Sequence, residues 1–385
     1  MPIIRGSHLP GQNKGQMLVF AVIFLIFLFS WQFFSLIADW FFFQEVGYAA
    51  VFSTTLLAQA ISAVLFAAVL FVILYVNLYL AVRLSGKEDD FMRSVPINIS
   101  IGPLDEGKLK RLCLIITLVI SVFAAVYGAS RWESLLRFQN GVSFNLQDPI
   151  FQRDVSFYVF QLPFIRHLYG WVTTALFLAL VATAAIYLVR RAFTFIPPAT
   201  FYSTAVAQRH LFILVALLFF LAGFGFWLDL SDLPFVKRGV VFGAGYTDAT
   251  TQVWVLYLLV ALSVLAGISF LGLIFRRDWR LPALVVVVFL LVLVAGRNFY
   301  PAIVQKFIVV PNEIVLEKPY LERNIRYTRL AYGLDSIEDR EFPALDNLTL
   351  KDIQKNYPTI KNIRLWDYAP LLQTYSQLQE IRTYY

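Results

Sequence analysis

Seven long apolar runs, none of which contains a charged residue, constrain this chain more than any other feature of its sequence. Most of them approach or exceed the ~20 residues that an α-helix needs to cross the ~30 Å hydrocarbon core of a bilayer. The runs are Met17–Ala38, Val51–Val82, Leu112–Tyr127, Leu168–Val189, Leu211–Leu228, Gln252–Phe275 and Leu281–Gly296. They predict an all-α polytopic membrane protein with about seven transmembrane helices.

The composition supports the same class of protein. Of the 385 residues, 59% are hydrophobic and only 15% are charged, whereas an average soluble domain has about 45–50% apolar and roughly 25% charged residues. These fractions exclude an ordinary soluble enzyme and an intrinsically disordered chain. The single cysteine, Cys113, excludes a disulfide scaffold. It lies at the start of an apolar run, so we interpret it as a small packed hydrophobe.

The net charge of +7 comes almost entirely from the segments that connect the apolar runs. The connecting segments on the side of the N-terminus hold 14 Lys and Arg residues, and those on the opposite side hold six. Because basic residues are in excess in cytoplasmic loops, this count predicts a cytoplasmic N-terminus and an extracytoplasmic C-terminal region. No basic stripe with exposed aromatic residues is present, so membrane lipids, and not nucleic acid, are the expected partners.

Two of the predicted external connections are rich in aromatic residues. Asp39–Tyr48 resembles the aromatic belt of a membrane interface, and Ser130–His167 contains eight Trp, Tyr and Phe residues. Within the second connection, Val155–Phe164 is apolar but too short to span, and Pro163 interrupts it. We expect an interfacial or re-entrant segment there.

The last 80 residues mix charged and apolar side chains. We therefore divide the chain into a transmembrane domain, residues 1–305, and a partial extracytoplasmic domain, residues 306–385. Pro319 is expected in the first turn of a helix that Gly333 ends, and a second helix is expected from Leu371 onward. We interpret this region as the start of a mainly helical external domain.

The familiar catalytic motifs are absent from the sequence. It contains no GxxxxGK[ST] phosphate-binding loop, no HExxH zinc-binding helix and no GxSxG nucleophile elbow. The three histidines, His8, His167 and His210, are predicted on two sides of the membrane, so they cannot share a metal site or form one catalytic triad. We expect His167 and His210, beside helix ends, to be solvated or to anchor the interface. The prediction is no catalytic residue, no metal, no cofactor and no enzymatic activity.

Charged residues at the edges of the predicted external segments form the one candidate site. Its residues are Arg131, Glu133, Arg137, Asp148 and Asp154, and Arg153 lies among them in the sequence. Asp229, Asp232 and Asp248 belong to the neighbouring external loop, and Arg297 lies at the edge of the last apolar run. One interpretation is a salt-bridged cap that holds the loops on the helices. A second is a site for a lipid headgroup or another polar ligand, with Arg131 and Arg137 binding phosphate. A third is acid–base chemistry by Asp148 and Asp154.

Small and polar residues inside the apolar runs predict how the helices pack. Ala175, Ala179 and Thr183 recur every four residues, so they form a ridge that favours close approach of a neighbouring helix. Gln59 and Asn77 are amide side chains within the second run, and we expect them to make hydrogen bonds between helices.

Several long strings in the chain resemble one family of proteins. They are DPIFQRDVSFYVFQLPF (Asp148–Phe164), GAGYTD (Gly243–Asp248), EKPYLERNIRYTRLAYGLD (Glu317–Asp335) and NIRLWDYAPLLQTYSQLQEIRTYY (Asn362–Tyr385). In their order and length these strings resemble the UPF0182 family of large prokaryotic membrane proteins. The resemblance implies about seven N-terminal transmembrane helices, followed by a large extracytoplasmic region of which this chain has the first part. It implies no catalytic residues.

Three classes of function fit the sequence. The first is a non-enzymatic, oligomeric envelope scaffold or conduit in the plasma membrane, because the runs lack charges and a region projects outside. The second is a transporter of lipid or another amphipathic molecule, which would need a polar groove that leads from residues 130–167 into the bundle. The third is an outer-surface enzyme that acts on lipid or cell-wall precursors, for which Asp and Arg side chains of two external loops would have to converge.

Overall fold

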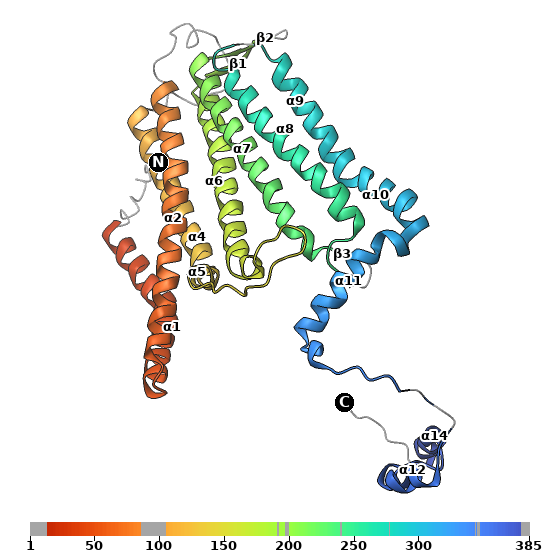
Figure 1. Cartoon of the computed structure of the whole chain (residues 1–385). Helices are drawn as coiled ribbons and strands as arrows, with labels where there is room; N and C mark the ends of the chain where they lie inside the picture. The colour runs from red at the N-terminus through yellow and green to blue at the C-terminus, as the bar shows by residue number, and fades with distance from the viewer. Residues whose placement is uncertain are drawn as a thin grey trace, which may run out of the picture. The chain divides into compact units, whose positions relative to one another are not determined.

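The computed structural model describes residues 14–85, 105–190, 192–196, 200–238, 241–276, 278–342, 344 and 347–378. They form two compact units, of which the first ends at Arg326 and the second begins at Tyr327. The first unit is a bundle of long helices (Figure 1). The predicted boundary between residues 305 and 306 stays a prediction, and His8 lies outside the described residues.

Most of the first unit is α-helical. Its helices are α1 (Lys14–Glu45), α2 (Ala49–Ser85), α4 (Glu106–Ala129), α5 (Trp132–Gln139), α6 (Leu162–Val189), α7 (Ala205–Asp232), α8 (Val253–Gly272), α9 (Arg280–Leu291), α10 (Tyr300–Val304) and α11 (Glu313–Ala331), whose last residues belong to the second unit. Two short antiparallel hairpins complete the fold. They are β1 (Phe193–Ile196) with β2 (Thr200–Ser203), and β3 (Lys237–Arg238) with β4 (Val241–Phe242).

Among the described residues, six helical stretches are long and apolar enough to cross a membrane. They are Ala49–Ser85, Glu106–Ala129, Phe157–Val189, Ala205–Phe235, Asp248–Gly272 and Arg280–Ala331. This finding confirms the predicted class of fold. The count of seven is not confirmed, although α1 is a continuous helix over the first apolar run.

The exposed faces of these helices are apolar, like the faces that pack against neighbouring helices. In the most apolar window of each stretch, only 17% to 39% of the residues are buried. Phe123 and Trp254, for example, expose 72% and 71% of their surface. Contact of so large an apolar surface with water is unfavourable, whereas contact with lipid is favourable.

The predicted ridge of small residues lies at a tight contact between helices. Ala175, Ala179 and Thr183 of α6 are fully buried, and the two alanines pack in a cluster with α2 and α4 residues. Gly128 of α4 approaches α2 so closely that an added Cβ would lie 2.6 Å from the carbonyl oxygen of Ser62. Close backbone approach is the usual way in which membrane helices gain packing energy.

A second group of helices packs through aromatic and branched side chains. Phe219 and Phe226 of α7 both contact the ring of Phe289 in α9. Leu256 and Leu259 of α8 are buried in the same cluster. Helix α7 lies beside α6 as well as α8, so it joins this group to α2, α4 and α6 (Figure 1).

Short non-α turns extend several helices. The π-helical turns are η1 (Phe157–Gln161), η3 (Asp248–Gln252), η4 (Val292–Phe299) and η5 (Gln305–Val309), and the 3-10 turns are η2 (Leu233–Phe235), η6 (Val310–Asn312) and η7 (Leu334–Ser336). The predicted interfacial segment Val155–Phe164 contains η1, which runs directly into α6. It therefore lengthens that helix to 33 residues and does not turn back.

The predicted start of a helix at Pro319 is wrong. Helix α11 begins at Glu313, and Pro319 lies inside it. The stretch from Arg280 to Ala331 is helical throughout, so the helix needs no new N-terminus at the proline. Gly333 has φ +66° directly after α11, as expected of a residue that ends a helix.

The second unit is small and helical. It contains α12 (Leu350–Lys355), α13 (Tyr357–Lys361) and α14 (Tyr368–Leu378). Thr349 and Asp352 form a reciprocal capping box at the start of α12, and the Thr349 hydroxyl lowers the pKa of Asp352. Leu365 and Trp366 are 96% and 86% exposed, in agreement with a region that has few apolar anchors of its own.

Candidate functional site

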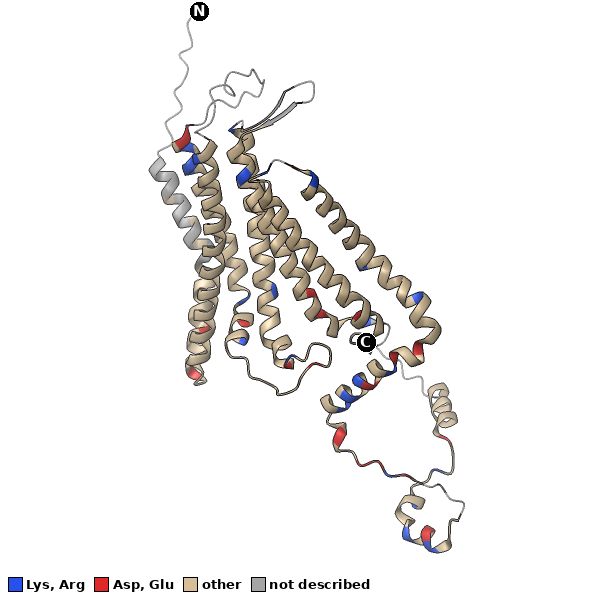
Figure 2. Cartoon of the chain, turned by 45° about the horizontal axis from the view of Figure 1, so that its top comes forward, with Lys and Arg blue, Asp and Glu red and all other residues tan. Residues whose placement is uncertain are grey.

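The charged side chains of the first unit gather at the ends of its helices (Figure 2). We use the term rim for the end that carries α5, the loop of residues 140–156, the C-terminal end of α7 and the β3–β4 hairpin (Figure 1). All five residues of the predicted site lie at the rim.

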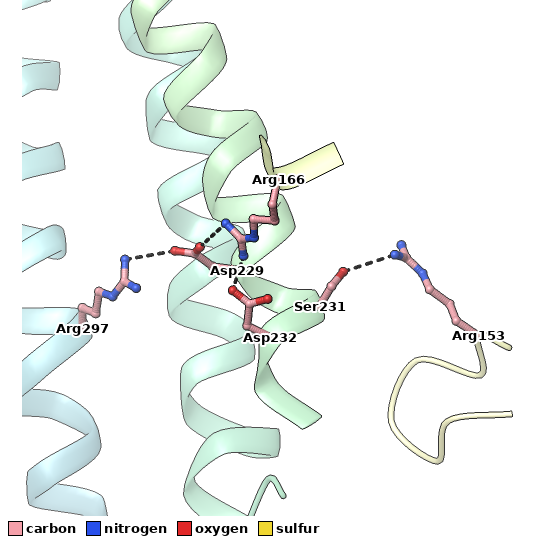
Figure 3. Close-up of polar contacts among 6 residues, drawn as sticks. All are labelled: Arg153, Arg166, Asp229, Ser231, Asp232 and Arg297. Atoms are coloured by element: carbon pink, nitrogen blue, oxygen red, sulfur yellow. Dashed lines mark hydrogen bonds and ion pairs between the residues drawn. The ribbon is translucent and has the colours of Figure 1, made fainter. Parts of the chain in front are cut away.

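An ion-pair network joins three helical segments at the rim (Figure 3). Arg166 of α6 donates to Asp229 of α7 at 3.0 Å and also to Asp232, one turn further along α7. Arg297 of η4 contacts the second carboxylate oxygen of Asp229 at 3.1 Å. Asp229 and Arg166 are the least exposed members, at 22% and 25% of their side chains. The network therefore ties α6, α7 and the extension of α9 together.

A second arginine contact lies on the neighbouring face of α7. Arg153 donates to the hydroxyl of Ser231 at 3.3 Å (Figure 3). Its guanidinium group lies 4.9 Å from the ring centroids of both Phe157 and Trp227. Cation–π contacts on two rings hold the loop that precedes α6 against α7.

The loop of residues 140–156 is folded around Asp154. Its carboxylate accepts hydrogen bonds from the Ser143 hydroxyl and from the backbone amides of Phe144, Asn145 and Ser156. These donors, the Ser143 hydroxyl first among them, hold the pKa of Asp154 far below its ordinary value. The carboxylate is thus a fixed anion that stabilises the loop.

Asp148 also serves the structure of this loop. It is buried, with 4% of its surface exposed, and it accepts hydrogen bonds from the amide of Phe151 at 2.6 Å and from the hydroxyl of Tyr158 at 3.2 Å. The loop contains two non-glycine residues with positive φ, Asn145 and Gln152. The partners of both aspartates belong to their own loop and the first turn of η1, which favours a structural role over acid–base chemistry.

The other three predicted residues lie on and beside α5. Glu133 and Arg137 pair at 2.5 Å, one turn apart, with more than half of each side chain exposed. Arg131 stacks on the ring of Tyr127, with its guanidinium carbon 5.2 Å from the ring centroid. Its Nε atom is buried and has no hydrogen-bond partner among the described residues. The structure thus joins Glu133 to Arg137 and leaves Arg131 outside that pair.

The strings GAGYTD and EKPYLERNIRYTRLAYGLD meet at the rim. The backbone amide of Tyr246 donates to both carboxylate oxygens of Glu317, at 3.2 and 3.0 Å, and the rings of Tyr246 and Tyr320 contact edge to face. A Cβ at Gly245 would lie 2.9 Å from a carboxylate oxygen of Glu317. Gly243 has φ +124°, which L side chains rarely adopt. The backbone conformation therefore favours glycine at position 243, and a side chain at position 245 would displace the carboxylate of Glu317.

Comparison with known proteins agrees with the strings that meet here. Residues 16–385 match the model of UPF0182, described as an uncharacterised protein family. The chain belongs to the UPF0182 family. It is 40% identical over 371 residues to a UPF0182 protein of Geobacter sp., which covers 95% of this chain and 41% of that protein. It is also 37% identical to a UPF0182 protein of Trichlorobacter lovleyi and 38% identical to one of Desulforamulus reducens, in each case with 90% of this chain and 39% of the relative covered.

The chain therefore spans about two fifths of the length of these UPF0182 relatives. No solved structure matches it. Within the described residues, no group of three or more His, Cys, Asp or Glu side chains could hold a metal ion.

The opposite end of this UPF0182 chain holds a buried polar cluster that the sequence did not predict. His210 of α7 is only 9% exposed, so the expectation that it is solvated or anchors an interface is wrong. Its Nε2 lies 3.0 Å from the side-chain oxygen of Asn77 in α2, and its Nδ1 lies 2.8 Å from the hydroxyl of Tyr187 in α6. The amide oxygen can only accept, so Nε2 donates. The expected role of Asn77 in bonding helices together is confirmed.

Sequence reasoning did not single out two residues of the rim. The only sequence signal for Arg166 is that it is an arginine just before the fourth apolar run, whereas its partners Asp229 and Asp232 lie in a different connecting segment. Glu317 was visible only as part of a family string. Neither signal names a partner, because both contacts join residues more than sixty positions apart.

Proposed function

We propose that this chain is the membrane anchor of a non-enzymatic envelope scaffold, which holds an external region at the plasma membrane. The proposal builds on membership of the UPF0182 family, on six apolar helices, and on relatives more than twice as long as the chain. It takes the rim as the external end, as the distribution of Lys and Arg predicts.

One observation carries the proposal, namely the contact of Glu317 with the start of the helix formed by η3 and α8. The amide of Tyr246 is one of the donors that the first turn of a helix leaves without a partner. A carboxylate at this position satisfies it and interacts favourably with the helix dipole. The first half of α11 is thereby bound to the bundle, as the anchor of a following region requires.

The polar groups of the rim support a structural role. Arg166, Asp229, Asp232 and Arg297 bind one another across three helical segments, and Asp154 is enclosed by donors of its own loop. Side chains arranged in this way make the end of the bundle rigid, as the anchor of a scaffold requires.

The first experiment is native mass spectrometry of the full-length protein, extracted from its own membranes in a gentle detergent. The proposal predicts a defined homo-oligomer that keeps its lipids. A monomer without bound lipid would contradict it.

A second experiment tests the contact that carries the proposal. In the variant Glu317→Gln, we expect faster hydrogen exchange at the backbone amides of residues 246–252 and in the first half of α11. Glu322→Gln is the matched control, because Glu322 lies on the same helix, is 65% exposed and reaches only Lys318 at 4.0 Å. Equal exchange in the two variants would mean that Glu317 does not hold α11.

The alternative function, transport of lipid or another amphipathic molecule, is favoured by a different observation. Five buried hydroxyl groups on α2, α4 and α6 have no hydrogen-bond partner in the described part of the chain: Ser62, Thr117, Ser121, Thr173 and Thr183. Buried polar groups without partners are uncommon and mark sites where water or a polar ligand binds. Vesicles that contain the full-length protein and a fluorescent lipid separate the two functions, since a transporter accelerates movement of the lipid between leaflets and a scaffold does not.

A further inference from the structure

The four arginines of residues 130–167 have different partners, and Arg131 is the one for which the described residues supply neither an anion nor a hydrogen-bond acceptor. Arg137 pairs with Glu133, and Arg166 pairs with two aspartates of α7. Arg153 is enclosed by two rings and the Ser231 hydroxyl. Arg131 makes no ion pair with any described residue. Its guanidinium group instead makes a cation–π contact with the ring of Tyr127.

Because part of the Arg131 side chain is buried, the lack of an anionic partner is energetically unfavourable. Its Nε atom is shielded from solvent and has no hydrogen-bond partner within the described ranges. The residue as a whole is partly exposed, and no described residue accepts a hydrogen bond from its two terminal nitrogens. A buried donor that remains unpaired costs free energy, and an anion that binds the guanidinium edge restores the missing interaction.

Aromatic side chains form an apolar floor beneath this cation. The rings of Tyr127 in α4 and Trp171 in α6 stack with their centroids 5.1 Å apart, and Phe66 of α2 contacts both. The Trp171 indole donates to the carbonyl oxygen of Phe66 at 3.2 Å, which fixes the ring. Aromatic rings of this kind lie at the level of lipid headgroups in membrane proteins.

The charge around Arg131 also favours an anion. The nearest acidic group of the sequence, Glu133, is already held by Arg137 at 2.5 Å. A guanidinium group with free terminal nitrogens presents two parallel donors, which suit the oxygens of a phosphate.

We propose that Arg131, stacked on Tyr127, binds the phosphate of an anionic phospholipid at the rim. The phosphate accepts from the guanidinium group, and the glycerol and upper acyl chain pack beside Tyr127 and Trp171. Of the five residues predicted for a headgroup site, Arg131 is therefore the one that binds the phosphate, and the aromatic rings beneath it contact the rest of the lipid. It can exist whether the protein acts as a scaffold or as a transporter.

The test measures lipid retained by the full-length protein after exchange into vesicles of phosphatidylcholine with or without phosphatidylglycerol. Native mass spectrometry then counts the phosphatidylglycerol molecules that remain bound. In Arg131→Gln we expect retention to fall about fivefold, the effect of removing one basic residue beside an anionic lipid. Arg137→Gln is the matched control, since its charge is already neutralised, and retention there should equal that of the wild type. Equal retention in both variants overturns the proposal.

A measurement on the wild type covers the case in which Arg131→Gln fails to fold. Hydrogen exchange of the amides of residues 127–137 should slow when phosphatidylglycerol is present in the vesicles. No difference between the two vesicle compositions overturns the proposal. The same slowing by inorganic phosphate in pure phosphatidylcholine vesicles would identify free phosphate as the ligand and overturn the lipid assignment.

Discussion

The two ends of the helical bundle use polar side chains in opposite ways. At the rim, charged groups that are 22% to 52% exposed pair across α6, α7 and η4. At the opposite end, His210 joins α2, α6 and α7 through neutral hydrogen bonds while only 9% exposed. Burial of an ion is costly unless it is well paired, whereas a neutral hydrogen bond tolerates burial. Solvent exposure therefore determines whether the helices are linked by ion pairs or by neutral hydrogen bonds.

The largest effect is expected from Asp229→Ala, which removes the central anion of the rim network. Arg166 then keeps only Asp232, and Arg297 loses Asp229, its partner in the network. We expect the free energy of unfolding in detergent to fall by about 2–3 kcal/mol, because two partly buried cations lose an anion. Thermal unfolding measures the change.

Asp232→Ala is the matched control for that variant. Asp232 is 52% exposed and, among the described residues, forms an ion pair with Arg166 alone, so its loss should cost clearly less than the loss of Asp229. Equal destabilisation would mean that exposure does not determine the strength of the rim contacts.

The next largest effect tests the neutral cluster. His210→Leu removes both hydrogen-bonding nitrogens from a buried position, and we expect a loss of about 2 kcal/mol in the free energy of unfolding. A neutral ring satisfies both contacts, with Nε2 donating to Asn77 and Nδ1 accepting from Tyr187, so this loss should not respond to added salt. A loss that disappears at high salt would show that the cluster is charged and would remove the contrast between the two ends.

A pH titration sharpens the comparison within the rim. Asp154 has a pKa lowered by its hydroxyl and amide donors, so its contribution to stability is complete above the ordinary Asp pKa of about 3.9. The contribution is lost only as the pH falls below that value toward the pKa in the folded state. The difference in hydrogen exchange of residues 143–145 between wild type and Asp154→Asn should therefore be the same at every pH from neutral to about pH 5. It should disappear only in stronger acid. Convergence near neutral pH would contradict the assigned role.

The smallest effect is expected from Glu133→Gln. The pair of Glu133 and Arg137 is more than half exposed, and such pairs on a helix contribute about 0.3–0.5 kcal/mol. A change of this size lies near the limit of thermal unfolding measurements, and added salt should reduce it further. A loss as large as that of Asp229→Ala would show that the pair has contacts beyond its own helix.

The sequence predicts helices far better than it predicts their contacts. Charge-free runs predict the six described helical stretches that are long and apolar enough to cross a membrane, because apolar length is a property of local sequence. The spacing of Ala175, Ala179 and Thr183 likewise predicts a packing face. The contacts of Arg166 with Asp229 and of Glu317 with Tyr246 depend on which helices become neighbours, and local patterns do not encode that. Helix ends are also difficult, as Pro319 illustrates, because a proline fits both the first turn of a helix and its interior at a bend.

The π-helical turn η4 has a consequence for how the sequence of this region can vary. A π turn holds more residues than an α turn, so it rotates every later side chain about the helix axis. Arg297 lies within η4 and meets Asp229, and Glu317 follows twenty residues later in the same helical stretch and meets Tyr246. Loss or gain of one residue in this segment would turn both side chains away from their partners. Substitutions on the lipid-facing side leave their direction unchanged, so natural variation here should preserve the number of residues more strictly than their identity.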